Sequence, residues 1–331
     1  MRLLVTGGAG FVGANFVLQT RRERPDVQLV VLDALTYAAN PASLTSVRDS
    51  VEVVHGDVAD AAVVDRLVAR VDAVVHFAAE SHNDRGLADP APFVATNLVG
   101  TYTLLEAVRR HGVRLHHVST DEVFGDLALD DPRRFREDSP YAPSSPYSAT
   151  KAGSDLLVRA WVRSFGVAAT ITHGSNTYGP HQHVEKFVPR QITRLLDGER
   201  PRLYGDGRHV RDWVHVDDHN SAVWAVLDRG RPGASYVVGA GGERSNRQVV
   251  ELLLEVFGQP PDAYDLVPDR PGHDRRYALD SGRLREELGW APRHTTLGAG
   301  LAATVEWYRD NEAWWRPQQA ASEARYAADG R

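Results

Sequence analysis

The sequence has no cysteine, and only two of its 38 basic residues are lysines. The absence of cysteine excludes disulfide bonds and thiolate metal sites. No apolar run approaches the roughly 20 residues that a membrane-spanning helix requires. The net charge of −6 provides no basic surface for nucleic acid. We therefore expect a cytoplasmic protein that binds neither membranes nor nucleic acid.

The two lysines, Lys151 and Lys186, stand out because arginine carries the positive charge everywhere else in the chain. Lysine is a compact charge on a flexible stem, whereas the guanidinium of arginine is a rigid plane. We therefore predict that both lysines lie where an arginine would not function.

The 331 residues are enough for one large domain or two modest ones. Short apolar runs predict strands at Leu3–Val5, Leu29–Leu32, Val51–Val54, Ala73–Phe77, Leu115–Val118 and Ala168–Thr172. Helical patterns between them lie at Phe11–Arg21, Ala61–Val71, Phe93–His111 and Tyr147–Phe165. This alternation predicts an α/β, Rossmann-like fold with a doubly wound parallel sheet.

A glycine-rich turn joins the first predicted strand to the first predicted helix. Gly7, Gly10 and Gly13 would allow a tight turn, a close approach to a pyrophosphate and close helix packing. The start of the helix would offer free N–H groups and a positive dipole end to phosphates. A plain turn is the alternative, but the strand–turn–helix context predicts dinucleotide binding.

Two acidic residues follow at the ends of later strands. Asp33 lies at the end of the second strand, where a carboxylate accepts hydrogen bonds from ribose hydroxyls and repels a 2′-phosphate. The cofactor is therefore predicted to be NAD and not NADP. Asp57 is placed to meet the adenine edge. The simpler alternatives are a loop cap at Asp33 and a turn carboxylate at Asp57.

Tyr147 and Lys151 are four residues apart on a predicted helix, so they share one face. A nearby ammonium stabilises a phenolate, and we expect it to lower the pKa of the tyrosine. Tyr147 would then accept the proton of an alcohol while hydride passes to a nicotinamide. The alternative is an unrelated surface pair.

Thr120, Asp121 and Glu122 follow the fifth predicted strand, at the sheet edge where open α/β folds bind ligands. Neighbouring carboxylates in a closed cleft have their pKa values driven apart, so one serves as an acid and the other as a base. Together with the Tyr–Lys pair, they predict an enzyme that oxidises an alcohol, eliminates water and reduces again. A solvated acidic pair is the alternative.

The chain resembles the dTDP-glucose 4,6-dehydratase family of the extended short-chain dehydrogenase/reductase superfamily, over about residues 1–310. The matching stretches are Thr6–Gly13, Leu35–Ala38, Phe77–His82, Val118–Gly125, Ser144–Lys151, Ser175-Asn176, Tyr178–Pro180, Glu185-Lys186, Arg211–Trp213 and Asp269–Arg276. The Thr-Asp-Glu triplet is specific to this family within the superfamily.

The resemblance implies a catalytic set of Thr120, Asp121, Glu122, Tyr147 and Lys151. Tyr147 would take the C4 hydroxyl proton as hydride leaves C4 for NAD, with Thr120 hydrogen-bonded nearby. Glu122 would remove the C5 proton, and Asp121 would protonate the departing C6 hydroxyl. Hydride would then return to C6 and a proton to C5, leaving a 4-keto-6-deoxy sugar nucleotide and NAD.

The resemblance also implies the binding residues. For the cofactor they are Gly7, Gly10, Phe11, Val12, Gly13, Asp33, Thr36, Asp57, Val58, Ala78, Ala79, Thr96, Tyr147, Lys151 and Thr177. For the sugar nucleotide, expected to be dTDP-glucose, they are Ser81, Asn176, Lys186, Tyr204, Arg211, Asn246, Arg270 and His273. Lys186 and Arg211 would face the diphosphate, and Tyr204 the base. We expect no metal and a homodimer formed by the helices at Phe93–His111 and Tyr147–Phe165.

The chain departs from the family pattern at several positions. The family usually has Val where Asn83 stands, Ser at Gly86 and Asn at Thr177, with further changes at Phe124 and Val184. These departures leave the hexose and the nucleobase open.

Two other functions compete with a dehydratase. A related sugar-nucleotide enzyme, such as a 4-epimerase or a uronate decarboxylase, would not need Asp121 together with Glu122. A non-catalytic dinucleotide sensor would be expected to have lost Tyr147 or Lys151.

The domain organisation follows from where the alternation weakens. We expect residues 1–176 to form the NAD-binding Rossmann domain, with later segments returning to it. Residues 177–315 would form mainly the sugar-nucleotide-binding domain, with Trp314 and Trp315 on a helix packed against it. The polar, alanine-rich residues 316–331 are expected to fray.

Overall fold

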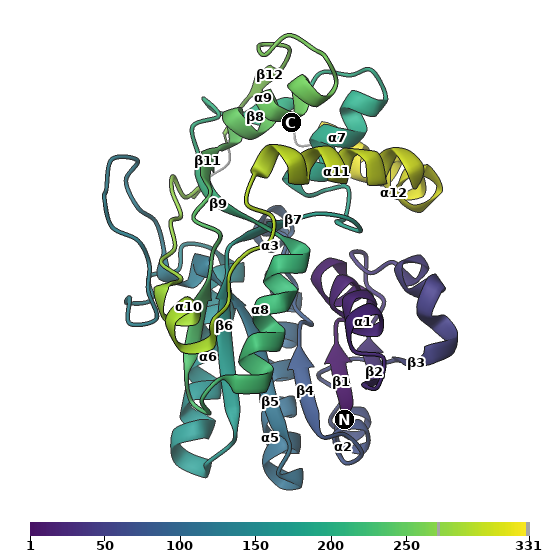
Figure 1. The fold of residues 1–331 in the computed structure, drawn as a ribbon, viewed down its shortest axis with the longest axis vertical. Helices are drawn as coiled ribbons and strands as arrows, with labels where there is room; N and C mark the ends of the chain where they lie inside the picture. Colours follow the sequence, from purple (N-terminus) through teal and green to yellow (C-terminus); the bar gives the residue numbers. More distant parts are fainter. Residues whose placement is uncertain (270–271, 329–331) are drawn as a thin grey trace.

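A seven-stranded parallel sheet forms the larger part of the molecule (Figure 1), which a computed structural model describes over residues 1–269 and 272–328. The strand order is β10-β6-β5-β4-β1-β2-β3. These strands are β1 (Arg2–Thr6), β2 (Gln28–Asp33), β3 (Val51–His55), β4 (Ala73–His76), β5 (Arg114–Thr120), β6 (Ala169–Gly174) and β10 (Ser235–Val238). The predicted doubly wound α/β fold is confirmed.

Helices cover both faces of this sheet, which is why its strands are apolar on both sides. One face is covered by α2 (Ala61–Val68), α5 (Thr101–His111) and α6 (Pro146–Phe165), and the other by α1 (Phe11–Glu23) and α8 (Val216–Arg229). On the second face Phe16 stacks on Trp224, with ring centroids 5.3 Å apart. The remaining cover comes from η1 (Pro41–Ser50) and α10 (Gly282–Leu288).

The predicted helix at Phe93–His111 is present but not uniform. It comprises α4 (Ala91–Phe93), a π-helical stretch η2 (Val94–Gly100) and α5. A Cβ on Gly100 would lie 2.5 Å from Val58, so this glycine allows the helix to approach the sheet edge closely. Hydrophobic periodicity did not predict the wider turn, because both helix types place apolar residues on one face.

A smaller lobe lies above the carboxyl ends of the parallel strands (top of Figure 1). Its helices are α7 (Phe187–Leu196), α9 (Asn246–Val256), α11 (Leu297–Asp310) and α12 (Glu312–Ala328). Its strands are β7 (Asn176–Tyr178), β8 (Arg202–Tyr204), β9 (Val210–His215), β11 (Glu243–Ser245) and β12 (Asp265–Val267). Trp315 is buried in this lobe's core beside Tyr308, as its aromatic character predicted. The domain division near residue 176 stays a prediction, and α8 and β10 return to the parallel sheet.

The expected fraying from residue 316 is wrong as far as residue 328, because α12 continues to Ala328. Glu323 pairs with Arg190 at 2.9 Å, and the Tyr326 hydroxyl donates to the Glu185 carbonyl at 2.7 Å. The composition of this segment did not reveal these contacts, because the partners lie on α7 and just before it. Among the described helices, none is both long enough and apolar enough to cross a membrane.

Candidate active site

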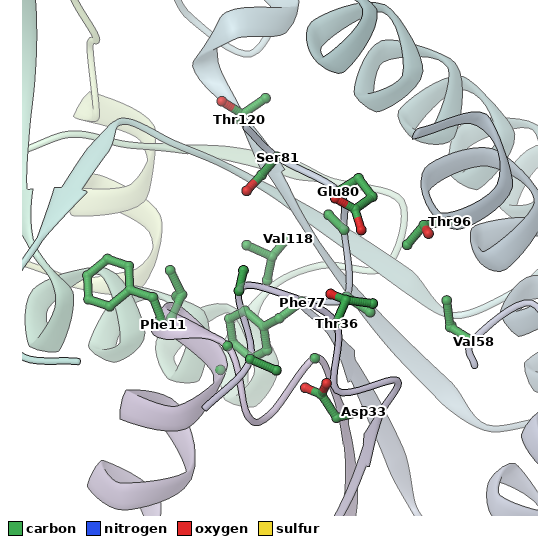
Figure 2. Close-up of a pocket in the computed structure, with 18 of the residues that line it drawn as sticks. Phe11, Asp33, Thr36, Val58, Phe77, Glu80, Ser81, Thr96, Val118 and Thr120 are labelled. Atoms are coloured by element: carbon green, nitrogen blue, oxygen red, sulfur yellow. The ribbon is translucent and has the colours of Figure 1, made fainter. Parts of the chain in front are cut away.

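The turn between β1 and α1 forms one wall of a cavity of about 290 Å³ (Figure 2). Gly7 has a φ of 69°, and a Cβ there would lie 2.6 Å from the backbone nitrogen of Ala78. A Cβ on Gly13 would lie 2.2 Å from the Gly7 carbonyl oxygen. Only glycine fits at these two positions, so the turn presents bare backbone at the start of α1, as a pyrophosphate site requires.

Asp33 lies at one end of this cavity, while Ser81 and Thr120 lie toward the other (Figure 2). Its two carboxylate oxygens accept hydrogen bonds from the backbone N–H groups of Ala9 and Leu35, each at 2.8 Å. Burial raises the pKa of Asp33, although these two hydrogen bonds oppose the increase. Each oxygen keeps a second acceptor position, which suits the two hydroxyls of a ribose.

All fifteen residues predicted to bind the cofactor line this one cavity. Further lining residues, which were not among the predicted binding residues, are Phe77, Val118, Ser175, His183 and His219. They come from the ends of β4, β5 and β6 and from segments beyond, which only the folded chain brings together. The glycine turn and the position of Asp33 together fit NAD.

Tyr147 lies in the first turn of α6, where the start of the helix is well defined. Ser145 caps the helix by accepting a hydrogen bond from the Ser148 N–H at 3.1 Å, and the Ser148 side chain accepts in return from Ser145 N–H at 2.9 Å. This capping box places Tyr147 in the same cavity as Thr120, whose side chain partly opposes the raised pKa of Tyr147.

The prediction that Lys151 lowers the pKa of Tyr147 is wrong, because that pKa is raised in the structure. Burial is the main cause, and the charge of Glu122 adds to it. The Lys151 ammonium donates to the Val118 carbonyl on β5 at 2.8 Å, and burial lowers the pKa of Lys151 itself to about 8. Helical spacing predicted the shared face but not the burial that dominates both pKa values.

The Thr-Asp-Glu triplet ends β5 and begins the short helix η3 (Asp121–Phe124). The Thr120 hydroxyl accepts from the Glu122 N–H at 3.3 Å and lies 3.4 Å from Asp121 Oδ1. Asp121 is only 1% exposed, and burial together with the charge of Glu122 raises its pKa well above the usual range. This is the direction predicted for an acid that holds its proton beside a base.

A second cavity, of about 170 Å³, meets the first at Ser81 and Lys186, which line both. It also contains Glu122. Seven residues predicted to bind the substrate line it: Ser81, Asn176, Lys186, Tyr204, Arg211, Asn246 and His273. The eighth, Arg270, lies outside the described residues. Lining residues that were not among the predicted binding residues include Asp84, Glu185, Gln191, Arg202 and Tyr326.

Two cations are positioned in this second cavity. The Lys186 ammonium donates to the Ser81 carbonyl at 3.1 Å. The guanidinium of Arg211, a buried residue, donates to the Val210 and Asp274 carbonyls at 2.8 and 2.9 Å and lies over the Tyr277 ring. Fixed cations in a cavity that adjoins a cofactor cavity suit a diphosphate.

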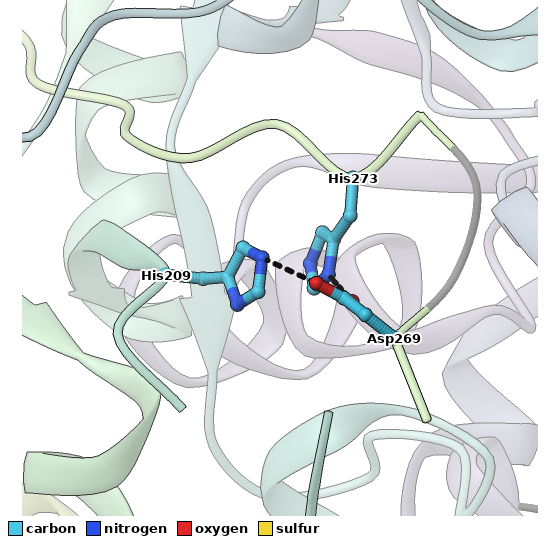
Figure 3. A group of neighbouring side chains, drawn as sticks. All are labelled: His209, Asp269 and His273. Carbon is cyan, nitrogen blue, oxygen red and sulfur yellow. Dashed lines mark hydrogen bonds and ion pairs between the residues drawn. The ribbon is translucent and has the colours of Figure 1, made fainter. Parts of the chain in front are cut away.

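His273 is held in place by a small cluster with His209 and Asp269 (Figure 3). The two imidazole rings stack with centroids 3.6 Å apart. Asp269 lies 2.7 Å from His273 Nδ1 and 3.2 Å from His209 Nε2. Because Arg275 lies 3.5 Å from His209 Nε2 and places a positive charge there, we interpret the cluster as a support for the cavity wall.

Comparisons with known proteins agree with this geometry. A family model described as GDP-mannose 4,6 dehydratase matches residues 4–302. A dTDP-glucose 4,6-dehydratase of Mycobacterium tuberculosis is 62% identical over 330 residues, which is 100% of both chains. The crystal structure of DesIV, a dTDP-glucose 4,6-dehydratase from Streptomyces venezuelae with NAD and TYD bound, is 49% identical with a TM-score of 0.92, covering 96% of this chain and 100% of that one. The corresponding Bacillus anthracis enzyme in complex with NAD is 40% identical with a TM-score of 0.90, covering 96% and 99%.

Proposed function

The chain belongs to the dTDP-glucose 4,6-dehydratase family, and on that basis we propose that it converts dTDP-glucose to dTDP-4-keto-6-deoxyglucose. The observation that carries this proposal is that Tyr147 lines the first cavity and Glu122 the adjoining second cavity, while the buried Asp121 directly precedes Glu122 and holds a raised pKa. Oxidation alone requires the tyrosine and the lysine. A neutral acid and a base beside them add the means to remove water.

NAD is the cofactor that the first cavity fits. When bound, NAD would accept the hydride that leaves C4 and return it to C6, so that the cofactor ends unchanged. The glycine turn leaves room for the pyrophosphate, and Asp33 offers acceptors to the ribose hydroxyls. The Asp33 carboxylate would repel the 2′-phosphate of NADP.

The side chains divide the proton transfers between them. Tyr147, which lines the first cavity together with Thr120, accepts the proton of the C4 hydroxyl. The C4 ketone then acidifies C5, and Glu122 takes the C5 proton. Asp121 keeps its own proton because its pKa is raised, and it donates that proton to the C6 hydroxyl as it leaves. Lys186 and Arg211 hold the diphosphate.

A homodimer is part of this proposal. Exposed apolar side chains gather on η2, α5 and α6, namely Val94, Val99, Tyr102, Leu156 and Phe165. They lie on the two helices from which the sequence predicts a dimer, and apolar patches of this kind mark interaction surfaces. The cytoplasmic location stays a prediction from the sequence.

Incubation of the purified protein with dTDP-glucose tests the proposal. We expect a 4-keto-6-deoxy product from the wild type, and at least about a hundredfold less from Glu122→Gln, since an essential base is lost. The variant should still bind NAD, which shows that it is folded. Reduced cofactor without product in the wild type would show that oxidation occurs but dehydration is not the function.

A further inference from the structure

Asn83 is the first residue of α3 (Asn83–Ala88) and lies against the predicted base of the elimination step. Its Nδ2 donates a hydrogen bond to Glu122 Oε2 at 3.1 Å, and both residues line the substrate cavity. A flipped amide would place Oδ1 against a carboxylate oxygen, where two acceptors repel. Glu122 therefore determines which way the Asn83 amide points.

The other end of the same amide lacks a partner. Asn83 Oδ1 is buried and has no hydrogen-bond donor among the described residues. A buried acceptor without a donor is unfavourable, and the cavity that Asn83 lines is where a donor can arrive. A hexose in this cavity would present hydroxyl groups, each of which can donate one hydrogen bond.

The helix that carries Asn83 is held firmly in place. Arg85 pairs with Glu185 at 3.1 Å and lies over the Tyr37 ring at 3.4 Å. A Cβ on Gly86 would lie 3.1 Å from the Phe93 ring, so α3 packs closely against α4. Asn83 is thus presented from a rigid element, which is the condition for orienting a catalytic side chain accurately.

We propose that Asn83 is a positioning and specificity-determining residue that connects Glu122 to a hydroxyl of the hexose. Nδ2 holds one Glu122 oxygen and leaves Oε1 for the C5 proton. Oδ1 accepts a hydrogen bond from a hydroxyl that stays on the sugar throughout the reaction. This inference rests on the proposed function, since Glu122 removes a C5 proton only in a dehydratase.

The first test follows oxidation and elimination separately in single turnovers with dTDP-glucose. In Asn83→Leu and Asn83→Val we expect elimination to slow about tenfold while oxidation changes less than about twofold, so that reduced cofactor accumulates. The two variants should behave alike, because they differ in volume but share the loss of the amide. Equal slowing of both steps, no slowing, or an effect in only one variant would overturn the positioning role.

The second test concerns the hydroxyl. The preference is measured as the ratio of kcat/KM for dTDP-glucose to kcat/KM for its 2-deoxy or 3-deoxy analogue. For one of the two analogues, this ratio should be about tenfold larger in the wild type than in either variant. An unchanged preference for both analogues would overturn the specificity role.

Both variants must bind NAD and match the wild-type Tm to within a few degrees. If wild type itself yields no 4-keto product, the proposed function fails; if it does and the variants match it, only the inference about Asn83 fails.

Discussion

At the scale of single residues, Lys151 contacts a buried network of polar side chains. Its Nζ is 3.4 Å from His117 Nε2, which is 3.2 Å from Asp155 Oδ1. Burial by itself would raise the pKa of Asp155, but the pKa is lowered. Hydrogen bonds from His117 and His173 to Asp155 are the main cause of this lowering. Ser119, Tyr141 and His173 are hydrogen-bonded to Asp155 Oδ2 at 2.9–3.0 Å. Asp155 is therefore an anion that favours the charged form of Lys151.

Asp155→Asn should shift the pH dependence of the oxidation step. The Asp155 charge raises the Lys151 pKa, which burial lowers to about 8, so removal of that charge lowers the pKa further. We expect the decline of oxidation at high pH to move down by about one pH unit, because Lys151 must be protonated. The measurement is the single-turnover rate of cofactor reduction against pH.

The control for this experiment is Ser119→Ala, which removes one neutral hydrogen bond from Asp155 but keeps its charge. Its pH profile should stay close to that of the wild type. The other titratable groups beside Lys151 are His76 and His117, and burial lowers both of their pKa values, so that they remain neutral at pH 7. An unshifted profile in Asp155→Asn would show that Asp155 does not act on Lys151.

At the scale of elements, the glycine turn before α1 depends on the absence of side chains. Gly13→Ala should weaken NAD binding at least about tenfold, because its Cβ would lie 2.2 Å from the Gly7 carbonyl and force the turn open. Calorimetric titration with NAD measures this loss.

Gly298→Ala on α11 is the matched control, since the nearest atom that its Cβ would meet outside its own helix, Leu252 Cδ2, lies 3.7 Å away. It should leave NAD affinity unchanged and raise the free energy of unfolding by about 0.5–1 kcal/mol, as is usual for this change in a helix. Equal NAD affinity in both variants would contradict the role of Gly13.

Helix α12 contributes a wall of the substrate cavity through Tyr326, which is 6% exposed. Tyr326→Ala should raise KM for the sugar nucleotide about three- to tenfold, because the ring under Arg190 and the hydrogen bond to Glu185 are both lost. NAD affinity should not change. Tyr326→Phe keeps the ring, so steady-state kinetics of the two variants separate packing from hydrogen bonding. Unchanged KM in Tyr326→Ala would show that α12 has no part in substrate binding.

At the scale of the whole molecule, the apolar patch on η2, α5 and α6 should mediate the proposed homodimer. Leu156 is 55% exposed there, and Leu156→Asp would place a charge within this apolar patch. We expect a monomer by light scattering. Leu266→Asp, at a position 56% exposed on β12 in the smaller lobe, should remain dimeric. A dimeric Leu156→Asp would place the contact elsewhere.

The sequence by itself determined the parallel sheet, the glycine turn, the Tyr147–Lys151 pair and the Thr-Asp-Glu triplet. These features depend on periodicity and on short spacings, which the backbone converts directly into local structure. They sufficed to predict the family, the cofactor and the chemistry. The residues predicted to bind the cofactor line one cavity because most of them follow a strand at one edge of the sheet.

Only the tertiary structure decided what depends on burial and on distant contacts. It raised the pKa of Tyr147, extended α12 to residue 328 and brought Tyr326 to the substrate cavity. It also brought the Asn83 amide into hydrogen-bonding contact with Glu122, which lies 39 positions further along the chain. No local pattern encodes such contacts, because desolvation and side-chain pairing arise only when separate elements pack together.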